Sequence, residues 1–391
     1  MPEFITAAEA LFKYTQDLRR DFHTHPELGF QEIRTSGIVA RELTSLGLDV
    51  QTGVGGTGVV ALLKGQKPGK VVLARADMDA LPIHEETGAI YTSENPGVMH
   101  ACGHDAHTAI LLTVAKLLTA QRDHLSGTVK FMFQPAEEGM GGAEKMIEAG
   151  ILQKPKVDFA LALHVWNEKP LGWIGITSGP VMASAEIFKI NIHGKGGHGA
   201  LPHLAVDPLL AAAQVISAVQ GIVARNISPL QTAVVSVCTI HGGDTFNVIP
   251  AEVEMTGTIR TFDAAVRTLV LERFEKIVHS VAEGMGCQVN IQVDKLTLAA
   301  VNHPDVTKRV QDVARNLFNT YEIETNFRTM GSEDFSYIQE KVPGCFVFIG
   351  SANHEKGLDA GHHHPKFDID EGVLPRGAAF MAAAILDLLK D

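Results

Sequence analysis

Strand and helix patterns alternate along most of the chain, and this alternation restricts its fold more than any other feature. Continuous apolar runs typical of buried strands, such as KVVLARADM at residues 70–78, are separated by segments in which apolar residues recur at helical spacing. The alternation holds from the start to about residue 178 and resumes after residue 294. Strands separated by helices predict an α/β fold with a mostly parallel, doubly wound sheet that carries helices on both faces.

Residues 180–293 follow a different order. Their patterns read strand, helix, strand, strand, helix and strand, which is the signature of a ferredoxin-like βαββαβ domain. The chain has 391 residues, whereas single hydrophobic cores stop growing at roughly 250–300 residues. We therefore expect a larger domain formed by residues 1–179 and 294–391, into which residues 180–293 are inserted as a smaller domain.

Charge and composition restrict the partners that the chain is expected to bind. It carries 33 Lys and Arg against 45 Asp and Glu, a formal net charge of -12, and it has no dense basic run. Neither nucleic acid nor an anionic membrane is therefore expected as a partner. The sequence contains no recognisable secretory pattern and no apolar stretch near the roughly 18 residues of a membrane span. With four scattered cysteines and no disulfide framework, it is expected to be a cytoplasmic protein acting on a small molecule.

Side chains able to bind metals or transfer protons gather where the predicted strands end. Aspartates follow the 70–76 strand, glutamates follow the 127–134 strand, and a histidine follows the 158–163 strand. The carboxyl ends of strands form the binding crevice of open α/β sheets, so these residues are expected to converge with the segment MHACGHDAHT at 99–108. The residues concerned are Asp77, Asp79, Cys102, His104, Glu137, Glu138 and His164.

A metal site explains this set of side chains better than any other single cause. Cys, His and Glu donors together favour Zn, Mn or Co over Ca or Mg. There are more donors than one tetrahedral shell needs, and a thiolate or a carboxylate can bridge, so a two-metal centre is plausible. Glu137 and Glu138 are adjacent and leave the strand to different sides. One can therefore bind a metal while the other acts as a general base.

Each of these features also has a structural explanation. Cys102 alone is more often a small buried hydrophobe than a ligand, and the aspartates and glutamates could cap turns or helices. His107 is expected to be an ordinary capping or core histidine. At most one of the three consecutive histidines at 362–364 is expected to face a given site. All these features would have to coincide by accident at the strand ends of one sheet, so the metal site is the favoured interpretation.

A nucleophilic cysteine is the main chemical alternative. It would need Cys102 to have an activating base, and His104 is only two residues away, which does not guarantee contact between the side chains. The neighbouring acidic residues would raise the pKa of the thiol and weaken it as a nucleophile. A bound metal removes this conflict, because it deprotonates the thiol and uses the carboxylates.

The motifs together resemble one known family, the M20 metallopeptidase superfamily in its amidohydrolase branch. That branch includes hippurate hydrolases, auxin-conjugate (IAA-amino acid) hydrolases, N-acetyl-diaminopimelate deacetylases and other N-acyl-L-amino acid amidohydrolases. The resemblance implies an inserted lid domain used for dimerisation, and hence a homodimer or homotetramer. It covers nearly the whole chain and rests on RRDFHTHPELGFQE, ADMDALP, MHACGHDAHTA, FQPAEEG, LHVW, GKGGHGALPH, NVIP, GSEDFS and HHHPKFDIDE.

The resemblance also implies a set of metal ligands. Two divalent ions per chain, either Mn, Zn, Co or Ni, would be bound, with Cys102 bridging them. His363 is selected from the three consecutive histidines because the family's ligand stands two positions before a proline, here Pro365. The implied ligands are Cys102, His104, Glu138, His164 and His363. Asp77 stands where other branches have a histidine ligand, and it is expected to lie behind the ligands.

Further residues acquire roles from the same resemblance. Glu137 matches the general base, and Asp79 matches the aspartate that orients a ligand or tunes the metal. His198 resembles the histidine that polarises the substrate carbonyl, within its own chain or across a subunit interface. Asn247 and Arg260 resemble groups that hold the substrate carboxylate, although a salt bridge at the rim is an equal alternative for Arg260.

One position departs from the family. Gly199 stands where the family often has Ala, and it is expected to loosen the loop after His198.

The expected activity is hydrolysis of the amide bond of N-acyl amino acids by a metal-activated water, with Glu137 as general base. A dipeptidase of the same fold is one alternative, and it would need a subsite for a free α-amino group. A non-catalytic metal- or ligand-binding relative is another. The full ligand set together with Glu137 favours an enzyme, because a binding protein does not need a base beside its metal. The acyl group and the amino acid are left open.

Overall fold

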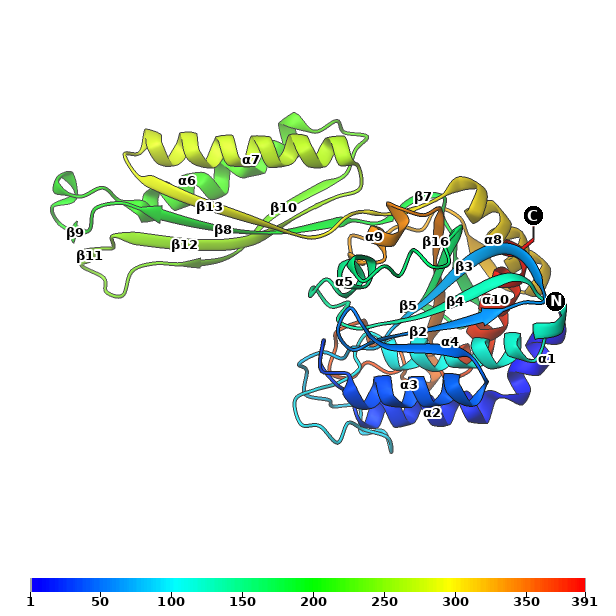
Figure 1. Cartoon of the computed structure of the whole chain (residues 1–391). Coiled ribbons are helices and arrows are strands. Elements are labelled where there is room, and N and C mark those ends of the chain that lie inside the picture. The colour runs from blue at the N-terminus through cyan, green and yellow to red at the C-terminus, as the bar shows by residue number, and fades with distance from the viewer. Residues whose placement is uncertain (1, 391) are drawn as a thin grey trace. The chain divides into compact units, whose positions relative to one another are not determined.

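The computed structural model describes residues 2–390 and divides the chain into two compact units (Figure 1). The smaller unit contains residues 182–300 and a short later segment, 329–333. The larger unit contains the rest of the chain.

An eight-stranded mixed sheet forms the centre of the larger unit, and it confirms the expected α/β fold class. The strand order is β1-β2-β4-β3-β5-β16-β6-β15. The pairs β3–β4, β3–β5, β5–β16 and β6–β15 are parallel, and the other three are antiparallel. The strands are β1 (Asp49–Val54), β2 (Gly58–Lys64), β3 (Lys67–Asp77), β4 (Ser126–Gln134), β5 (Phe159–Pro170), β6 (Trp173–Gly175), β15 (Glu322–Glu324) and β16 (Gly344–Ala352). Two further short strands, β7 (Gly179–Met182) and β14 (Ala300–Asn302), pair separately.

Helices cover both faces of this sheet. The long helices α4 and α10 pack against each other and contact β3 and β5, while α5 contacts β4 and the short α9. Figure 1 shows α5 on the face opposite α4. The helices of the larger unit are α1 (Pro2–Ala10), α2 (Phe12–Thr24), α3 (Ile33–Ser45), α4 (His104–Thr119), α5 (Gly142–Glu148), α8 (Pro304–Leu317), α9 (Ser336–Gln339) and α10 (Val373–Leu388).

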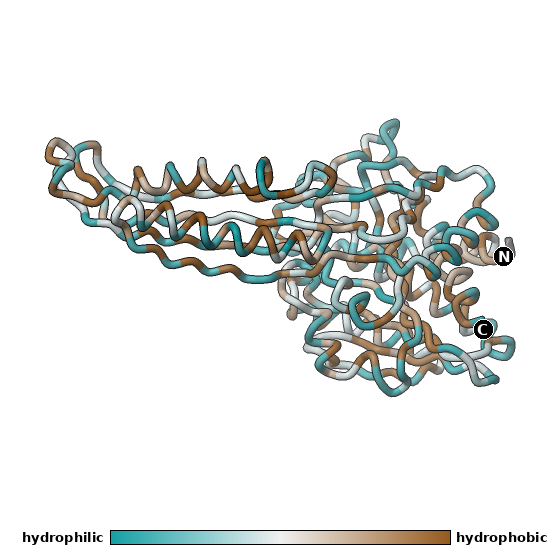
Figure 2. Tube along the Cα trace, turned by 90° about the horizontal axis from the view of Figure 1, so that it is seen from above, coloured by the Kyte–Doolittle hydropathy of each residue, from teal (hydrophilic) through white to brown (hydrophobic). Residues whose placement is uncertain are grey.

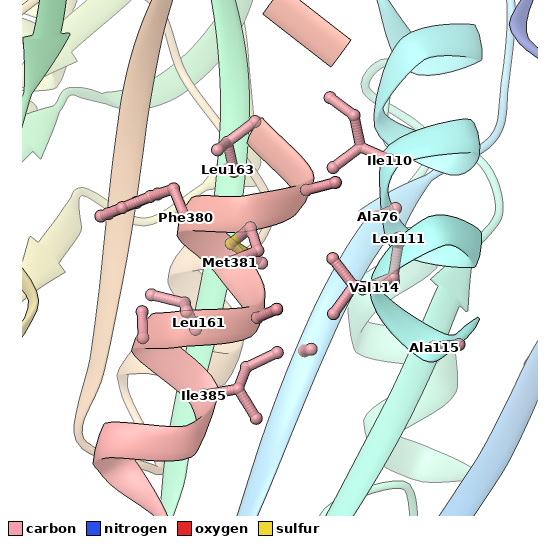
Figure 3. Packing of buried hydrophobic residues seen from close by; sticks show 14 of the residues in the cluster. Ala76, Ile110, Leu111, Val114, Ala115, Leu161, Leu163, Phe380, Met381 and Ile385 are labelled. Atoms are coloured by element: carbon pink, nitrogen blue, oxygen red, sulfur yellow. The ribbon is translucent and has the colours of Figure 1, made fainter. Parts of the chain in front are cut away.

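The core of the larger unit lies between α4, α10 and the sheet. Both helices are apolar on nearly all sides, which is the pattern of a helix buried in a large core. Figure 3 shows Val114 of α4 and Ile385 of α10 pointing into the space between the two helices, whereas Phe380 points away from α4. This packing fixes α4, whose first turn carries His104, against the strand ends.

The smaller unit has the expected βαββαβ order. Its four antiparallel strands run in the order β10-β12-β8-β13, and its helices α6 and α7 pack against them. Side chains of β8 alternate between buried and more exposed positions, so that Phe188, Ile190 and Ile192 face the core. Figure 2 shows hydrophobic and hydrophilic residues alternating along the strands and helices of this unit. The elements are β8 (Ser184–His193), α6 (Pro208–Gly221), β10 (Ala233–His241), β12 (Glu252–Thr261), α7 (Ala264–Gly284) and β13 (Gln288–Thr297).

Strand β13 is longer than the sequence predicted. The expected strand ended at residue 293, whereas β13 continues to Thr297, which pairs with Ala185 of β8. The polar residues after 293 ended the apolar pattern, but ladder pairing with β8 extends the strand.

Among residues 2–390, one helical stretch, Pro208–Asn226, is long and apolar enough to cross a membrane by length and composition alone. This evidence is weak, because Ala211, Val215 and Val219 on one side of the stretch are buried in the core of the smaller unit.

Candidate metal centre

The candidate site lies at the carboxyl ends of β3 and β4 and alongside β5. Asp77 is the last residue of β3, and Glu137 and Glu138 follow β4. The prediction for His164 was wrong in one respect: β5 continues to Pro170, so His164 lies within the strand and not at its end. On the side facing β3, however, the last paired residue of β5 is Ala162, whose partner is Arg75. The backbone of β5 beyond Ala162 is therefore open to the site on that side.

The structure brings together the five residues named as metal ligands. They form two groups of three, each with ligand atoms within 4.8 Å of one another, and Cys102 belongs to both. The Sγ atom of Cys102 lies 3.6 Å from Nε2 of His164, and Nε2 of His363 lies 3.2 Å from Oε1 of Glu138. The two groups are Cys102, His104 and His164, and Cys102, Glu138 and His363. A shared thiolate is what a bridge between two ions requires.

Hydrogen bonds determine which nitrogen His104 and His164 present to the site. Nδ1 of His104 lies 2.9 Å from the backbone oxygen of Asp79, and Nδ1 of His164 lies 2.6 Å from the backbone oxygen of Val165. Because a carbonyl oxygen only accepts, each Nδ1 carries a hydrogen, and in the neutral form of each ring Nε2 is the nitrogen that has the lone pair. Holding Nδ1 in this way is typical of metal-binding histidines.

Within residues 2–390, the buried Nε2 of His104 has no hydrogen-bond partner, and Oε1 of Glu138 has only the ion-pair contact with Nε2 of His363 at 3.2 Å. Buried polar atoms are nearly always satisfied, so unpartnered ones need an explanation. Nε2 of His104 lies 3.6 Å from Oδ2 of Asp77 and 4.0 Å from Oε1 of Glu138, so it faces carboxylate oxygens at distances too long for a hydrogen bond, and a cation among these atoms would satisfy them. The residues present therefore fit a divalent transition metal.

Asp79 holds two of the candidate ligands. Its Oδ2 accepts the backbone N–H of Glu138 at 3.0 Å, and its Oδ1 lies 3.3 Å from Nδ1 of His104. The side chain itself is 2% exposed. This position, behind the ligands and touching two of them, suits a residue that orients them.

His107 is buried and fully hydrogen-bonded. Its Nε2 accepts the backbone N–H of Val165 at 2.9 Å, so its Nδ1 carries the hydrogen that Asp77 accepts at 2.6 Å. With both nitrogens occupied, His107 has no lone pair for a metal. It instead supports the backbone beside His164, which agrees with the structural role expected for it.

The expectation that only one of three consecutive histidines faces the site was wrong. His363 reaches Glu138 as described above, and Nδ1 of His362 lies 3.9 Å from Sγ of Cys102. The backbone of His363 is left-handed, with φ 64°, and this turn allows neighbouring side chains to approach one site. Such backbone strain in a non-glycine residue is concentrated at functional sites.

Burial and charge determine the protonation of the donors in the metal-free protein. Burial raises the pKa of the Cys102 thiol, and the Glu138 carboxylate raises it further. Burial lowers the pKa of His164 well below its usual value, so this imidazole is neutral. Hydrogen bonds to Cys102 and Glu138 raise the pKa of His363 to about 10. Burial alone would lower the pKa of His104, but Asp77, Asp79 and Cys102 together raise it well above its usual value. A cation would have to displace protons from Cys102, His104 and His363, whereas His164 already has a free lone pair.

A buried ion pair supports the floor of the site. Burial alone would raise the pKa of Asp77, but Arg75, His104 and His107 together hold that pKa well below its usual value. Arg75 donates to Asp77 at 2.6 Å and to Gln134 at 2.9 Å. Sequence reasoning did not identify Arg75, although a single cation inside the apolar run KVVLARADM was a visible signal.

Glu137, the expected general base, lies beside the ligands. It is 8% exposed, and its carboxylate lies within 4.8 Å of ligand atoms of His104 and Glu138. Its Oε1 accepts the backbone N–H of Asp334 at 3.4 Å. Ala136, immediately before it, has a left-handed backbone with φ 53°. The carboxylates of Glu137 and Glu138 lie within 4.8 Å of each other, and both lie beside His104.

The three predicted residues of the smaller unit are not all neighbours. His198 in β9 (Gly197–His198) pairs with Val248 in β11 (Val248–Ile249), directly after Asn247. Arg260 lies eight residues beyond the start of β12 at Glu252, or about 26 Å along the strand. The structure therefore brings His198 and Asn247 together but places Arg260 at the opposite end of the sheet.

His198 and Arg260 each have donors available for a ligand. Nδ1 of His198 accepts the backbone N–H of Ala200 at 3.0 Å, so the exposed ring carries its hydrogen on Nε2. Nε of Arg260 donates to Thr258 at 3.1 Å, and within residues 2–390 no carboxylate forms an ion pair with this guanidinium. A salt bridge at the rim, the alternative considered for Arg260, is therefore not seen.

Gly199 has a different effect from the one expected. A Cβ atom at this position would lie 3.1 Å from the backbone oxygen of Asn247, and the N–H of Gly199 donates to that same oxygen at 2.8 Å. The glycine thus permits a close approach between two strands, and its N–H fixes the loop.

Comparisons with known proteins place the chain among hydrolases. The model of peptidase family M20/M25/M40 matches residues 73–387. The chain is 43% identical to thermostable carboxypeptidase 1 of Saccharolobus solfataricus, with 94% of this chain and 93% of the relative covered. It is 40% identical to N-acetylcysteine deacetylase of Bacillus subtilis, with 96% and 97% covered. It is 39% identical to IAA-amino acid hydrolase ILR1-like 4 of Arabidopsis thaliana, with 97% and 87% covered.

A solved structure agrees with these matches. The chain superimposes with a TM-score of 0.85 and 36% identity on a dinuclear metal-binding peptidase of the M20 family from Bacillus subtilis, covering 97% of this chain and 99% of that one. A mixed α/β fold with grouped Cys, His and Glu side chains beside its strand ends is thus the architecture of a metal-binding hydrolase. The chain belongs to peptidase family M20/M25/M40. The family resemblance recognised in the sequence is confirmed.

Proposed function

We propose that the protein is a metal-dependent amidohydrolase that cleaves the amide bond of N-acyl amino acids. The observation that carries the proposal is the pair of three-residue groups sharing Cys102, with the Glu137 carboxylate within 4.8 Å of members of both. A carboxylate beside a metal centre is needed for hydrolysis but not for storage or structural binding of a metal. Two relatives, a deacetylase and an IAA-amino acid hydrolase, are named for reactions of this type.

Two divalent ions per chain are proposed, held by the five ligands with Cys102 as the bridge. Soft and borderline donors favour Mn, Zn, Co or Ni, and availability selects among these. When bound, such ions lower the pKa of water and polarise a carbonyl oxygen.

Glu137 moves the protons in this proposal. Its carboxylate takes a proton from the attacking water and then delivers that proton to the leaving amine nitrogen. Burial to 8% exposure keeps bulk water away and leaves the carboxylate facing the ligand groups. Asp79 acts through His104 and Glu138, which it holds in place.

His198, Asn247 and Arg260 are proposed to bind the substrate. The Nε2–H of His198 would donate to the acyl carbonyl oxygen, while Asn247 and the guanidinium of Arg260 would hold the carboxylate of the amino acid. Because Arg260 lies about 26 Å along β12 from the end that adjoins the β9–β11 pair with His198, one copy of this unit cannot apply both to one small substrate. Substrate binding would then use Arg260 of one chain and His198 of another, which supports the proposal of a homodimer, or a homotetramer built from such pairs.

Peptide cleavage is the second candidate function, because the relative from Saccharolobus solfataricus is named a carboxypeptidase. An N-acyl amino acid and the C-terminal end of a peptide share one feature, a scissile amide next to a residue with a free carboxylate. The candidates differ in the group before that amide, which is a simple acyl group in one case and an amino-acid residue in the other. A non-catalytic relative would have the ligands but no turnover.

The test is amine release from a panel of substrates by protein stripped with a chelator and reloaded with Mn or Zn. The panel contains acetyl, benzoyl, succinyl and indole-acyl amino acids together with dipeptides and longer peptides. Metal-restored cleavage of acyl amino acids supports the proposal, and cleavage of peptides alone would replace it with a peptidase. No turnover despite two bound ions would indicate a binding protein. Fractionation of cells would test the proposed cytoplasmic location.

A further inference from the structure

His362 is a half-buried residue beside the site that is not among the five proposed ligands. It is the first of three consecutive histidines, and its imidazole ring is lodged among aromatic groups. Its centroid lies 4.8 Å from that of Trp166 and 5.1 Å from that of Phe367. It also lies 5.3 Å from the ring of His164. A ring packed on several sides cannot turn freely, so the direction of its nitrogens is fixed.

A backbone N–H of β5 that has no partner in β3 determines the tautomer of this ring. The backbone N–H of Asn167 donates to Nε2 of His362 at 3.2 Å. The Asn167 side chain donates to the backbone oxygens of Ala360 and Asp368, and these two bonds hold the segment that contains His362 against β5. A nitrogen that accepts a hydrogen bond carries no hydrogen, so the hydrogen of the neutral ring is on Nδ1. Neither nitrogen then has a lone pair for a metal.

The Nδ1–H of His362 faces Cys102. Its distance to Sγ is 3.9 Å, and the backbone carbonyl of Cys102 is the competing acceptor. A thiolate carries a full negative charge, and hydrogen bonds to charged acceptors are roughly twice as strong as those between neutral groups. The sulfur is therefore the favoured acceptor once Cys102 is deprotonated.

We propose that His362 is a positioning residue that donates its Nδ1–H to the Cys102 thiolate and does not itself bind a metal. This inference rests on the proposed function, in which Cys102 is a bridging ligand. The hydrogen bond would fix the direction of the sulfur lone pairs and withdraw electron density from them. His362 would then orient Cys102 through a hydrogen bond, as Asp79 orients His104.

Two variants separate the hydrogen bond from the packing of the ring. His362→Phe keeps an aromatic ring between Trp166 and Phe367 but removes the donor. His362→Asn removes the ring but places an amide N–H near the position of Nδ1. His364→Phe is the matched control, because His364 belongs to the same run and is exposed. The proteins are loaded with Co(II), and the sulfur-to-cobalt charge-transfer band and the metal affinity are measured.

The expected result is a band at longer wavelength in His362→Phe, because a thiolate without its donor gives up electrons more easily. Metal affinity should fall about 10-fold, as for other residues that hold a ligand. His362→Asn and His364→Phe should keep the band of the unmodified protein. An unchanged band and affinity in His362→Phe would overturn the inference and leave the proposed function standing.

Two other results would also overturn it. Loss of one of two bound ions in both His362 variants would make His362 a ligand. A missing charge-transfer band in the unmodified cobalt protein would show that Cys102 does not bind the metal, and the proposed site would then fail together with this inference.

Discussion

Replacement of Glu137 by Gln tests the chemistry of the proposed site with little change in its shape. Glutamine has the same length, and its Oε1 can still accept the N–H of Asp334, which the carboxylate accepts at 3.4 Å. It cannot take a proton from water. The variant therefore removes the base while leaving the five ligands and their supports in place.

The size of the expected effect follows from that single loss. General acid–base catalysis contributes about 100- to 10,000-fold, so kcat should fall by this factor. It corresponds to about 2.7–5.4 kcal/mol of activation free energy at 1.36 kcal/mol for each tenfold. Metal content should remain at the level of the unmodified protein, because Glu137 is not among the ligands.

The assay is amine release under saturating substrate, with the metal content of each preparation measured in parallel. Glu148→Gln is the matched control, since Glu148 belongs to α5 of the same segment and is exposed. A Glu137→Gln protein that retains more than about a tenth of the kcat with full metal content would refute the assignment, because that loss is below the range for a general base. Loss of metal from the variant would show that Glu137 is a ligand.

Further predictions concern the ligands, the support and the assembly. Cys102→Ala should lower the number of bound ions, as counted by metal analysis, because it removes the shared member of both groups. Asp77→Asn should lower the free energy of unfolding of the metal-free protein by about 1–3 kcal/mol in urea, because it removes the charged acceptor of a buried Arg75 hydrogen bond while Arg75 keeps its contact with Asp334. The raised pKa of His363, about 10, means that its proton competes with the metal, so the metal affinity measured by calorimetry should increase as pH rises through neutrality. Equal mixtures of His198→Ala and Arg260→Ala chains, after subunit exchange, should recover about a quarter of the unmodified activity if each site uses two chains, and none if each site uses one.

The fold could be predicted because its apolar patterns are long and uninterrupted. The runs that form β3, β4 and β16 are mostly buried on both faces of the sheet. The helices α4 and α10 contribute to the same hydrophobic core. The hairpin of β1 and β2 was not identified. Its first strand, Asp49–Val54, is exposed at most positions and buried only at Val54, so that strand has no continuous apolar run. Its position depends on pairing with β4, which a local pattern does not contain.

The residues of the site could be found from the sequence, but their arrangement could not. The family resemblance implied Cys102, His104, Glu138, His164 and His363 as ligands, and the structure does group them together. The supports depend on contacts between distant segments, such as Arg75 with Asp77 and Gln134, or Asp79 with Glu138. The separation of His198 from Arg260 depends on the direction of β12 in its sheet. None of these contacts leaves a trace in local spacing.

Four of the histidines at this site differ in their backbone partners, and for two of them the cause is the end of the pairing between β3 and β5. Beyond Ala162, the N–H groups of Val165 and Asn167 have no strand partner on that side, and His107 and His362 accept them instead. These two rings are thereby committed to Nδ1–H and cannot bind a metal. His104 and His164 donate from Nδ1 to backbone oxygens, and so keep Nε2 for a ligand role. Since all four are buried or partly buried imidazoles near the same cysteine, residue type and distance alone would not separate ligands from supports. The backbone partner of each ring does separate them, and it does so before any metal is bound.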